Sequence, residues 1–426
     1  MAYTIGICTL GCRVNQYESS ALARLFENEG FVISPFDEKC DAYVINTCTV
    51  TAESDRKSRQ TVRRALSNGT VVAVCGCSSQ LNAQVFYDLG AHYVCGTRNK
   101  LSVFDYIKEN IGKAPERKIN STAPSSLPYE NMNGISTERT RAYVKIQDGC
   151  DGACTYCAIK NARGCSVSRD EEEILCEVKT LVNEGFCEFV LTGIETSSYK
   201  NLPSLIKKVS EIDGVKRIRL GSLDPSFLRP DITDALLSCD KLCPHFHLSV
   251  QSGSDRILAL MKRKYNSAIL RRNIDYILSK NNDFRFSCDI IAGFPTETES
   301  DLEDTASLLK DYPFVHAHIF PYSERSGTPA AEMIGMLPKA ERKKHAEYLD
   351  KISAAKAKVL MEKAVNEKKQ HSVLFETYKN GILCGHAEDF TEVFMHSTED
   401  LKGKIIAVRA DSIIDGKLFC VMMSAN

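Results

Sequence analysis

The chain has 426 residues, of which 43% are apolar and 26% charged, and its formal net charge is −1. These values describe an ordinary globular protein with room for two or three domains, and they exclude a globally basic protein, so any nucleic-acid footprint must be local. No apolar run reaches the roughly 20 residues of a membrane-spanning helix, and the N-terminus lacks the features of an export signal. We expect a cytoplasmic protein with no membrane partner.

Residues 1–112 alternate strand-like and helix-like segments. The expected strands are "YTIGICTLG", "DAYVINTC", "TVVAVCGC" and "AHYVCG", and the expected helices are "QYESSALARLFENEG" and "AESDRKSRQTVRRALSNG". Repeated β-α units of this kind predict an α/β domain built on a doubly wound parallel sheet.

Three of the 18 cysteines follow strands of this sheet. Most cysteines in a reducing compartment are expected to be small buried hydrophobic residues. Cys12, Cys48 and Cys77, however, lie just past the ends of the first three strands. Because the carboxyl ends of parallel strands meet at one edge, where ligands gather, we expect these thiols to share a site; a chance placement is the alternative.

The remainder of the chain divides into a linker and two further domains. Residues 113–135 are rich in Pro, Ser, Thr and Asn and are expected to be the linker. Residues 136–368 contain six β-α units, too few for a closed eight-unit barrel, and predict an open (βα)6 partial barrel that ends in a long helix from Pro338. Residues 369–426 read as short strands and turns, which indicates a small β-barrel that serves as a binding module.

The stretch "GCDGACTYCAIKNARG" holds Cys150, Cys154 and Cys157 within eight residues. A structural zinc ion requires four ligands, and no fourth Cys or His stands at a suitable spacing. A four-iron, four-sulfur (4Fe-4S) cluster held by three thiolates keeps one iron open for a substrate. Gly149 and Gly152 would let the loop curl and turn N–H groups toward an anionic cluster.

The spacing Cys-x3-Cys-x2-Cys, with Tyr156 before the last cysteine, resembles the signature of the radical S-adenosylmethionine superfamily. Motifs along nearly the whole chain resemble, more closely, the methylthiotransferases of that superfamily. These motifs are "TLGCRVNQYES", "NTCTVTAESDRKSRQ", "GCSSQ", "KIQDGCDGACTYCAIKNARG", "VLTGI", "RIRLGSLDP", "CPHFHLSVQSGSDRILALMKRKY", "DIIAGFP" and "HIFPYSERSGTPA".

The resemblance implies two 4Fe-4S clusters and S-adenosylmethionine as cofactors. Cys150, Cys154 and Cys157 would hold the radical-generating cluster, and Cys12, Cys48 and Cys77 an auxiliary one. Two S-adenosylmethionine molecules would be used, one as methyl donor and one as radical source. It also implies a C-terminal TRAM domain that binds RNA and an electron donor of the flavodoxin or ferredoxin type. The sulfur donor is not indicated.

Within the family, "TLGCRVNQYES" resembles the branch that acts on N6-threonylcarbamoyladenosine beside the tRNA anticodon. The isopentenyladenosine branch reads nearer to "GCQMN" and the ribosomal-protein branch to "GCPKN". Both of these substrates stay open as alternatives, as does a noncatalytic, zinc-containing RNA-binding protein.

Further positions carry weaker expectations. Residues expected to contact S-adenosylmethionine are Tyr156 of the cysteine loop and, at barrel strand ends, Gly193, Ser249, Gln251 and Gly293. The alternative for the two glycines is that they only turn the chain. Basic residues of one helix that are expected to bind RNA phosphates are Arg56, Lys57, Arg59, Arg63 and Arg64. A second basic run, Lys262–Lys264, carries the same expectation, and a solvated helix face is the alternative for each run.

Overall fold

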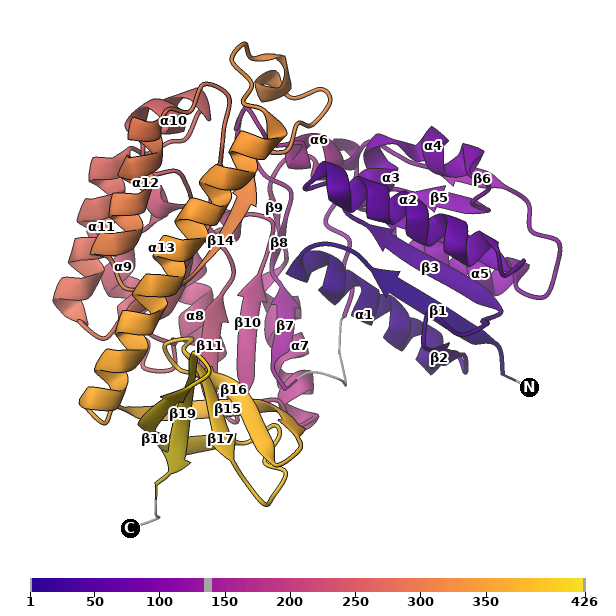
Figure 1. The fold of residues 1–426 in the computed structure, drawn as a ribbon. Helices are drawn as coiled ribbons and strands as arrows, with labels where there is room; N and C mark the ends of the chain where they lie inside the picture. Colours follow the sequence, from indigo (N-terminus) through magenta and orange to yellow (C-terminus); the bar gives the residue numbers. More distant parts are fainter. Residues whose placement is uncertain (1, 134–139, 424–426) are drawn as a thin grey trace.

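The computed structural model describes residues 2–133 and 140–423, which form three compact parts (Figure 1). An N-terminal sheet domain lies beside a larger central barrel, and a small closed barrel lies below the central one. Among the described residues, no helix combines the length and the apolar character needed to cross a bilayer.

The N-terminal domain is a six-stranded, all-parallel sheet in the order β2-β1-β3-β4-β5-β6. Its strands are β1 (Thr4–Thr9), β2 (Val32–Ser34), β3 (Ala42–Thr47), β4 (Val71–Gly76), β5 (Tyr93–Cys95) and β6 (Lys118–Asn120). Its helices are α1 (Arg13–Asn28), α2 (Ala52–Leu66), α3 (Cys77–Leu81), α4 (Ala83–Asp88) and α5 (Leu101–Asn110). The order 2-1-3-4-5 places a switch point, where ligands bind, between β1 and β3.

Alternate residues of each strand face opposite layers of helices, which makes the sheet doubly wound. Ala42 and Val44 of β3 pack in one core with α1 and α5. Tyr43 and Ile45 pack in a second core with α2 and α4. The doubly wound parallel sheet predicted from the sequence is therefore confirmed.

The segment expected to be a linker is partly ordered into this sheet. Lys118–Asn120 form β6, which pairs in parallel with the otherwise open edge of β5, and Pro124–Ser126 form a 3-10 turn, η1. An unpaired edge strand exposes backbone donors and acceptors, and this short strand satisfies them. The expected boundary between residues 135 and 136 lies outside the described residues.

The central domain contains six parallel barrel strands in two three-stranded sheets, β11-β10-β7 and β12-β13-β14, and two isolated parallel bridges, Ile218–Leu242 and Leu223–Leu248, lie between the two sheets. Its strands are β7 (Ala142–Lys145), β10 (Glu188–Thr192), β11 (Arg217–Leu220), β12 (His245–Gln251), β13 (Arg285–Ala292) and β14 (Phe314–Pro321), beside a small hairpin of β8 (Gln147–Asp148) and β9 (Val167–Ser168). Its helices are α6 (Ile159–Arg163), α7 (Glu171–Asn183), α8 (Leu202–Ser210), α9 (Pro230–Leu237), α10 (Asp255–Leu260), α11 (Ser267–Lys280), α12 (Glu299–Asp311) and α13 (Lys339–Asn366), with 3-10 turns η2 (Thr196–Ser198), η3 (Pro225–Phe227) and η4 (Pro329–Glu332). The open six-unit barrel and its closing long helix match the prediction.

The C-terminal domain is a closed five-stranded barrel in the order β15-β16-β17-β19-β18, as expected for a TRAM domain. The strands are β15 (Gln370–Lys379), β16 (Ile382–Ala387), β17 (Glu392–His396), β18 (Ile405–Ile414) and β19 (Lys417–Met422). Helix α13 runs along the central domain and leads directly into β15 (Figure 1).

A buried carboxylate joins the central domain to this small barrel. Glu188, fully buried at the start of β10, accepts hydrogen bonds from Arg217 (3.3 Å) and Arg219 (2.7 Å) and ion-pairs with Arg141 (3.1 Å). Arg219 in turn donates to the carbonyl of Ala387 in the small barrel at 2.6 Å. Burial opposes ionisation of Glu188, but Arg219 and its neighbours lower the pKa of the carboxyl to about 2.

Glu188→Gln is expected to lower the free energy of unfolding by about 3 kcal/mol at pH 7, because the carboxylate is ionised in the folded state. A folded-state pKa depressed from 4.5 to about 2 contributes stability above pH 4.5 that is lost as the pH falls toward 2. Denaturation curves between pH 7 and pH 3 should show that the variant loses less stability on acidification than the wild type. Asp231→Asn, which removes an exposed pair with Arg229, is the control and should keep the wild-type pH dependence. Equal acid sensitivity of wild type and Glu188→Gln would contradict this assignment.

Candidate functional site

The first cysteine trio lies at the carboxyl ends of three adjacent strands. Cys12 caps α1 after β1, Cys48 directly follows β3, and Cys77 begins α3 after β4. Burial raises the pKa of the Cys48 thiol to about 11, and the nearby Cys77 and Cys12 add to that rise. The sheet therefore gathers three residues that are far apart in the sequence, at the switch point of the fold.

The backbone around this trio leaves no space for additional side chains. A Cβ at Gly11 would lie 2.7 Å from Cys48 Sγ, and one at Gly76 would lie 2.4 Å from the carbonyl oxygen of Thr47. Both glycines also have positive φ angles, of 104° and 106°. Glycine is therefore required at both positions.

The second trio lies on the loop between β8 and α6, beyond the first barrel strand. Backbone N–H groups point at its sulfurs: Gly152 donates to Cys150 Sγ (3.2 Å) and Ile159 to Cys157 Sγ (3.4 Å). A Cβ at Gly152 would lie 3.1 Å from Cys150 Sγ. The glycine thus lets the loop close around the sulfurs, as expected from the sequence.

One sulfur of each trio accepts a hydrogen bond from an arginine side chain. Arg263 donates to Cys154 Sγ at 3.2 Å, and Arg163 donates through Nε to Cys77 Sγ at 3.3 Å. Hydrogen bonds to sulfur stabilise anionic thiolates and tune the potential of a cluster that they hold. Val50 supplies a similar backbone donor to Cys48 Sγ, at 3.5 Å.

The sulfur arrangement does not suit a single zinc ion. Thiolates bound to one zinc lie about 3.8 Å apart. Within the described residues, the group of three metal-ligating side chains whose donor atoms all lie within 4.8 Å of one another is His247, Asp289 and His318, and neither cysteine trio meets that limit. A 4Fe-4S cluster, whose thiolate ligands bind different irons, does not require the sulfurs to lie so close together.

Arg163 links the two trios through a buried charge network. Its guanidinium donates to Asp148 Oδ1 (2.9 Å), beside the second trio, and to Glu18 Oε1 (2.9 Å) of the N-terminal domain. Lys145 bonds both carboxylates at 2.7 Å, and Lys100 pairs with Glu18. Arg98, also buried, lies 4.0 Å from Asp148. Four buried cations thus face two buried carboxylates, and one of them, Arg163, stands beside Cys77. This surplus of positive charge suits an anionic thiolate–iron group at this position.

A cavity of about 180 Å³ lies between the loops of the two domains. Thr49 and Val50 from the first trio's loop form one wall, and Cys157 with Tyr156 from the second trio forms another. Gln251 also lines it, with a strained positive φ of 63°. Residues from both cysteine loops therefore border one shared cavity.

The other residues expected to bind S-adenosylmethionine are less closely grouped. Gly193 follows β10, where a Cβ would lie 2.6 Å from Gln147 Oε1, and Ser249 lies in β12, where its carbonyl accepts from Arg263. Gly293 follows β13 and packs against α13, where a Cβ at this position would lie 2.5 Å from Cγ of Arg342. All three stay predictions.

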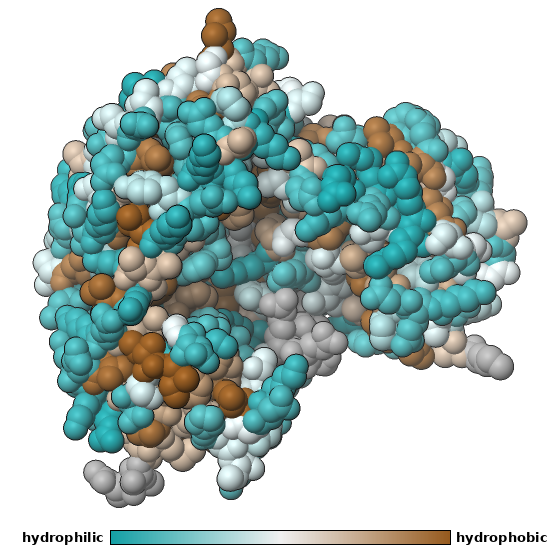
Figure 2. Space-filling model, in the orientation of Figure 1, coloured by the Kyte–Doolittle hydropathy of each residue, from teal (hydrophilic) through white to brown (hydrophobic). Residues whose placement is uncertain are grey.

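Helix α2 presents its basic residues to solvent, and its outward face is strongly hydrophilic in Figure 2. Arg56 is paired with Glu53, and Arg64 with Asp37. Lys57, Arg59 and Arg63 make no ion pair with another described residue. These three are available for phosphate, and the RNA role of the helix stays a prediction.

The second basic run, Lys262–Lys264, does not direct all three of its side chains to solvent. Lys262 and Lys264 are exposed, but Arg263 turns inward to Asp224 (2.8 Å) and Cys154. The expectation that this residue binds phosphate is wrong, because its guanidinium already serves the cysteine loop. Arg163 and Arg263 are the functional residues that sequence reasoning missed, and the adjacent motifs "NARG" and "KRKY" were the available signals.

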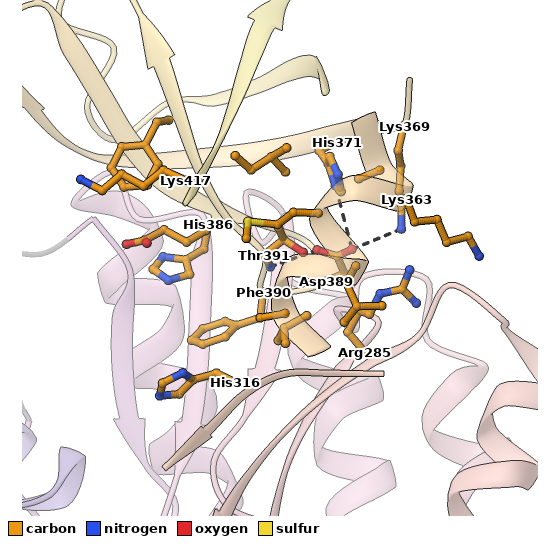
Figure 3. Close-up of a pocket in the computed structure, with 18 of the residues that line it drawn as sticks. Arg285, His316, Lys363, Lys369, His371, His386, Asp389, Phe390, Thr391 and Lys417 are labelled. Carbon is orange, nitrogen blue, oxygen red and sulfur yellow. Dashed lines mark hydrogen bonds and ion pairs between the residues drawn. The ribbon is translucent and has the colours of Figure 1, made fainter. Parts of the chain in front are cut away.

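A larger cavity of about 500 Å³ lies between β14, the end of α13 and the C-terminal barrel (Figure 3). Arg13, which follows Cys12, lines it together with His316 and His318. His318 belongs to the His247–Asp289–His318 group, in which His247 Nε2 lies 3.1 Å from Asp289 Oδ2. Two imidazoles and a carboxylate are capable of holding a cation.

Comparisons with known proteins agree with this architecture. Residues 144–309 match the model of the Radical SAM superfamily, and residues 4–96 match that of the Uncharacterized protein family UPF0004. The chain is 35% identical to the threonylcarbamoyladenosine tRNA methylthiotransferase MtaB of Bacillus subtilis, over 95% of this chain and 93% of that protein. It is 35% identical to the protein of the same name from Thermotoga maritima, over 91% and 90%.

A second group of relatives carries a different substrate name. The tRNA-2-methylthio-N(6)-dimethylallyladenosine synthase of Carboxydothermus hydrogenoformans is 33% identical over 97% of each chain.

Among solved structures, the radical S-adenosylmethionine methyltransferase TsrM of Kitasatospora setae matches with a TM-score of 0.55 and 13% identity, over 78% of this chain and 77% of that one. The structural likeness shows a shared fold.

Arg163→Met is expected to lower the free energy of unfolding by about 3–5 kcal/mol, because it leaves Glu18 and Asp148 with reduced compensation in a buried site. Iron content after anaerobic reconstitution should fall as well, since Cys77 loses its donor. Arg163→Lys keeps the positive charge but not the planar guanidinium. Its stability and iron content should lie between those of the wild type and Arg163→Met. Arg24→Met, which removes the half-exposed pair with Glu184, is the control and should cost about 1 kcal/mol or less. The network has no such role if Arg163→Met behaves like Arg24→Met in denaturation and iron analysis.

Proposed function

This chain belongs to the radical S-adenosylmethionine tRNA methylthiotransferases, and we propose that it converts N6-threonylcarbamoyladenosine, beside the tRNA anticodon, to the 2-methylthio derivative. The observation that carries the proposal is that loops of two separate cysteine trios border one cavity. The threonylcarbamoyladenosine substrate is supported by the names of the two relatives at 35% identity.

The residues proposed to hold the cofactors follow from the trios. Cys150, Cys154 and Cys157 would hold the cluster that the family implies, and Cys12, Cys48 and Cys77 would hold a second, auxiliary cluster. Each trio leaves one iron without a protein ligand. A reduced 4Fe-4S cluster supplies the electron that cleaves S-adenosylmethionine to an organic radical able to take hydrogen from an unactivated carbon.

The remaining chemistry in the proposal belongs to the chain itself. Both domains line the cavity, so a cofactor and a base bound there would together displace water from around a reactive radical. Tyr156 and Gln251 on its wall would orient S-adenosylmethionine, with Gly193, Ser249 and Gly293 as weaker candidates. The target base would have to leave its stack to enter. The cations of α2 would hold the surrounding phosphates.

Partners and domain roles complete the proposal. Residues 1–112 would be the methylthiotransferase domain, 136–368 the radical core and 369–426 the RNA-binding TRAM domain. A flavodoxin or ferredoxin would supply electrons, and a separate donor would supply sulfur. A tRNA substrate favours the cytoplasm as the place of action.

A second candidate keeps the same chemistry and changes the base. The 33% identity to the dimethylallyladenosine enzyme favours N6-isopentenyladenosine as the alternative. Deleting the gene in its host and measuring tRNA nucleosides by mass spectrometry separates the two. We expect 2-methylthio-threonylcarbamoyladenosine to disappear and its unmethylthiolated precursor to accumulate, with isopentenyladenosine products unchanged. Full retention of the methylthiolated threonylcarbamoyl nucleoside would falsify the preferred substrate.

The two trios should be separable by substitution. Cys154→Ala is expected to abolish formation of 5′-deoxyadenosine from S-adenosylmethionine. Cys48→Ala should preserve that cleavage and eliminate sulfur insertion into RNA. Cys239→Ala lies in neither trio and should keep both activities, at a packing cost of about 1–2 kcal/mol. The division of labour fails if Cys154→Ala and Cys48→Ala lose cleavage to the same extent in chromatographic assays.

A further inference from the structure

We propose that Arg13 binds the carboxylate of the threonylcarbamoyl group and so selects the modified adenosine. The inference rests on the proposed function, because only a substrate that carries a carboxylate offers an anion to this guanidinium. It assigns a specificity role to a residue of the larger cavity, which is distinct from the cysteine ligands.

The larger cavity has the size and lining of a small-molecule site. Its volume of about 500 Å³ lies within the usual range for such pockets. Five of its lining side chains are lysine or arginine: Arg13, Arg285, Lys363, Lys369 and Lys417. The cavity is therefore positively charged on several sides, and the partners of each cation decide which is free for a ligand.

Four of these cations are already engaged. Lys369 pairs with Asp283 (3.1 Å) and with Asp389 (3.3 Å), the second of which is visible in Figure 3. Arg285 and Lys363 have carboxylate partners as well, Asp283 at 3.6 Å and Glu367 at 3.8 Å. Lys417 lies over the ring of Phe394, 4.7 Å from its centroid.

Arg13 is the exception. It makes no hydrogen bond or ion pair with another residue of the ranges 2–133 and 140–423. Its positive charge nevertheless acts on neighbouring groups, because it contributes to lowering the pKa values of His245, His318 and Asp289. An unpaired guanidinium beside a cavity is a ready binding group for a carboxylate, which it can hold with two parallel hydrogen bonds.

The histidines near Arg13 are uncharged, so Arg13 is the main positive charge on its side of the larger cavity. Burial lowers the pKa of His318 to about 4 and also lowers the pKa values of His316 and His245, so all three are neutral at pH 7. Neutral imidazoles can still donate hydrogen bonds to an anion. The charge of Arg13 also disfavours a cation between His247, Asp289 and His318, so this corner suits an anionic ligand better than a metal ion.

The carboxylates of the cavity do not occupy Arg13. Asp389 is held by Lys369, and Glu367 by Lys363. Glu392 accepts from Cys384 Sγ at 3.7 Å. Asp289 is held by His247 at 3.1 Å. Each anion near the guanidinium thus has another partner.

The position of Arg13 relates the two cavities. It directly follows Cys12 of the first trio, and Asp289, within its electrostatic range, lines the smaller cavity. In a purine, C2 and C6 flank N1, so the N6 substituent begins on the same edge of the six-membered ring, only a few ångströms from C2. The threonylcarbamoyl group extends over several bonds beyond C6, so a base with C2 at the smaller cavity would let the carboxylate of this group reach toward the larger one. An isopentenyl group is apolar and would leave Arg13 unpaired there, which disfavours it.

The test is a binding experiment on the reconstituted full-length protein. RNA hairpins of the anticodon arm would carry threonylcarbamoyladenosine, its threonine methyl ester, isopentenyladenosine or unmodified adenosine. The ester keeps the shape and removes the charge. We expect the wild type to bind the acid about tenfold or more tightly than the ester, and Arg13→Gln to bind both with equal affinity. Arg13→Lys should keep part of the preference.

The matched control is Arg59→Gln on α2, which should weaken acid and ester hairpins by the same factor. The iron content and the thermal midpoint of each variant show whether it has lost its cluster or its fold. If Arg13→Gln has lost either, the inference is tested by Arg13→Lys and by the ratio of acid to ester affinity in the wild type. An undiminished acid preference in Arg13→Gln, or no acid preference in the wild type, would overturn the inference. Wild-type preference for the isopentenyl hairpin over the threonylcarbamoyl acid would instead overturn the proposed function.

Discussion

The buried ion network around Arg163 is the constraint on which the rest of the site depends. It contains Glu18 and Lys100 from the N-terminal domain and Lys145, Asp148 and Arg163 from the central one, all nearly inaccessible to water. Charges in such a place are costly unless each has its partners in good geometry. Because those partners come from both domains, a shift of one domain would leave uncompensated charge. The network therefore fixes how the two cysteine loops face each other.

The same network connects domain assembly with the cysteines. Four buried cations, counting Arg98 beside Asp148, face two carboxylates, and Arg163 extends to Cys77 Sγ. An anionic group on Cys77 would offset part of this positive surplus, so loading of the first trio and docking of the domains should stabilise each other. Arg263 has a comparable place in the second trio, where it ties Cys154 to Asp224.

The sequence predicted those features that depend on local patterns. Strand-ending cysteines could be grouped because parallel topology brings carboxyl ends together, and Gly152 could be recognised from its place between Cys150 and Cys154. The edge strands β2 and β6 were missed because each has only three residues and no clear alternation. Glu188 and Arg163 could not be identified, since their roles arise from partners that are distant in the chain. Arg263 was assigned to RNA for the same reason: a basic run looks alike in sequence whether its side chains face solvent or a sulfur.

The smaller cavity exists only because the domains are docked at two places. Deep in the interface, Arg163 binds Glu18. At the rim, Arg325 of the central domain binds Asp55 and Thr49, and the N–H of Ala52 donates to Ser323 Oγ at 3.0 Å. Thr49 and Ser323 both line the cavity that lies between these contacts. Residues of both domains line this space, so the chemistry proposed for the two cysteine loops requires the assembled protein. The contacts that stabilise the interface thereby also determine the shape of the cavity in which we propose that the reaction occurs.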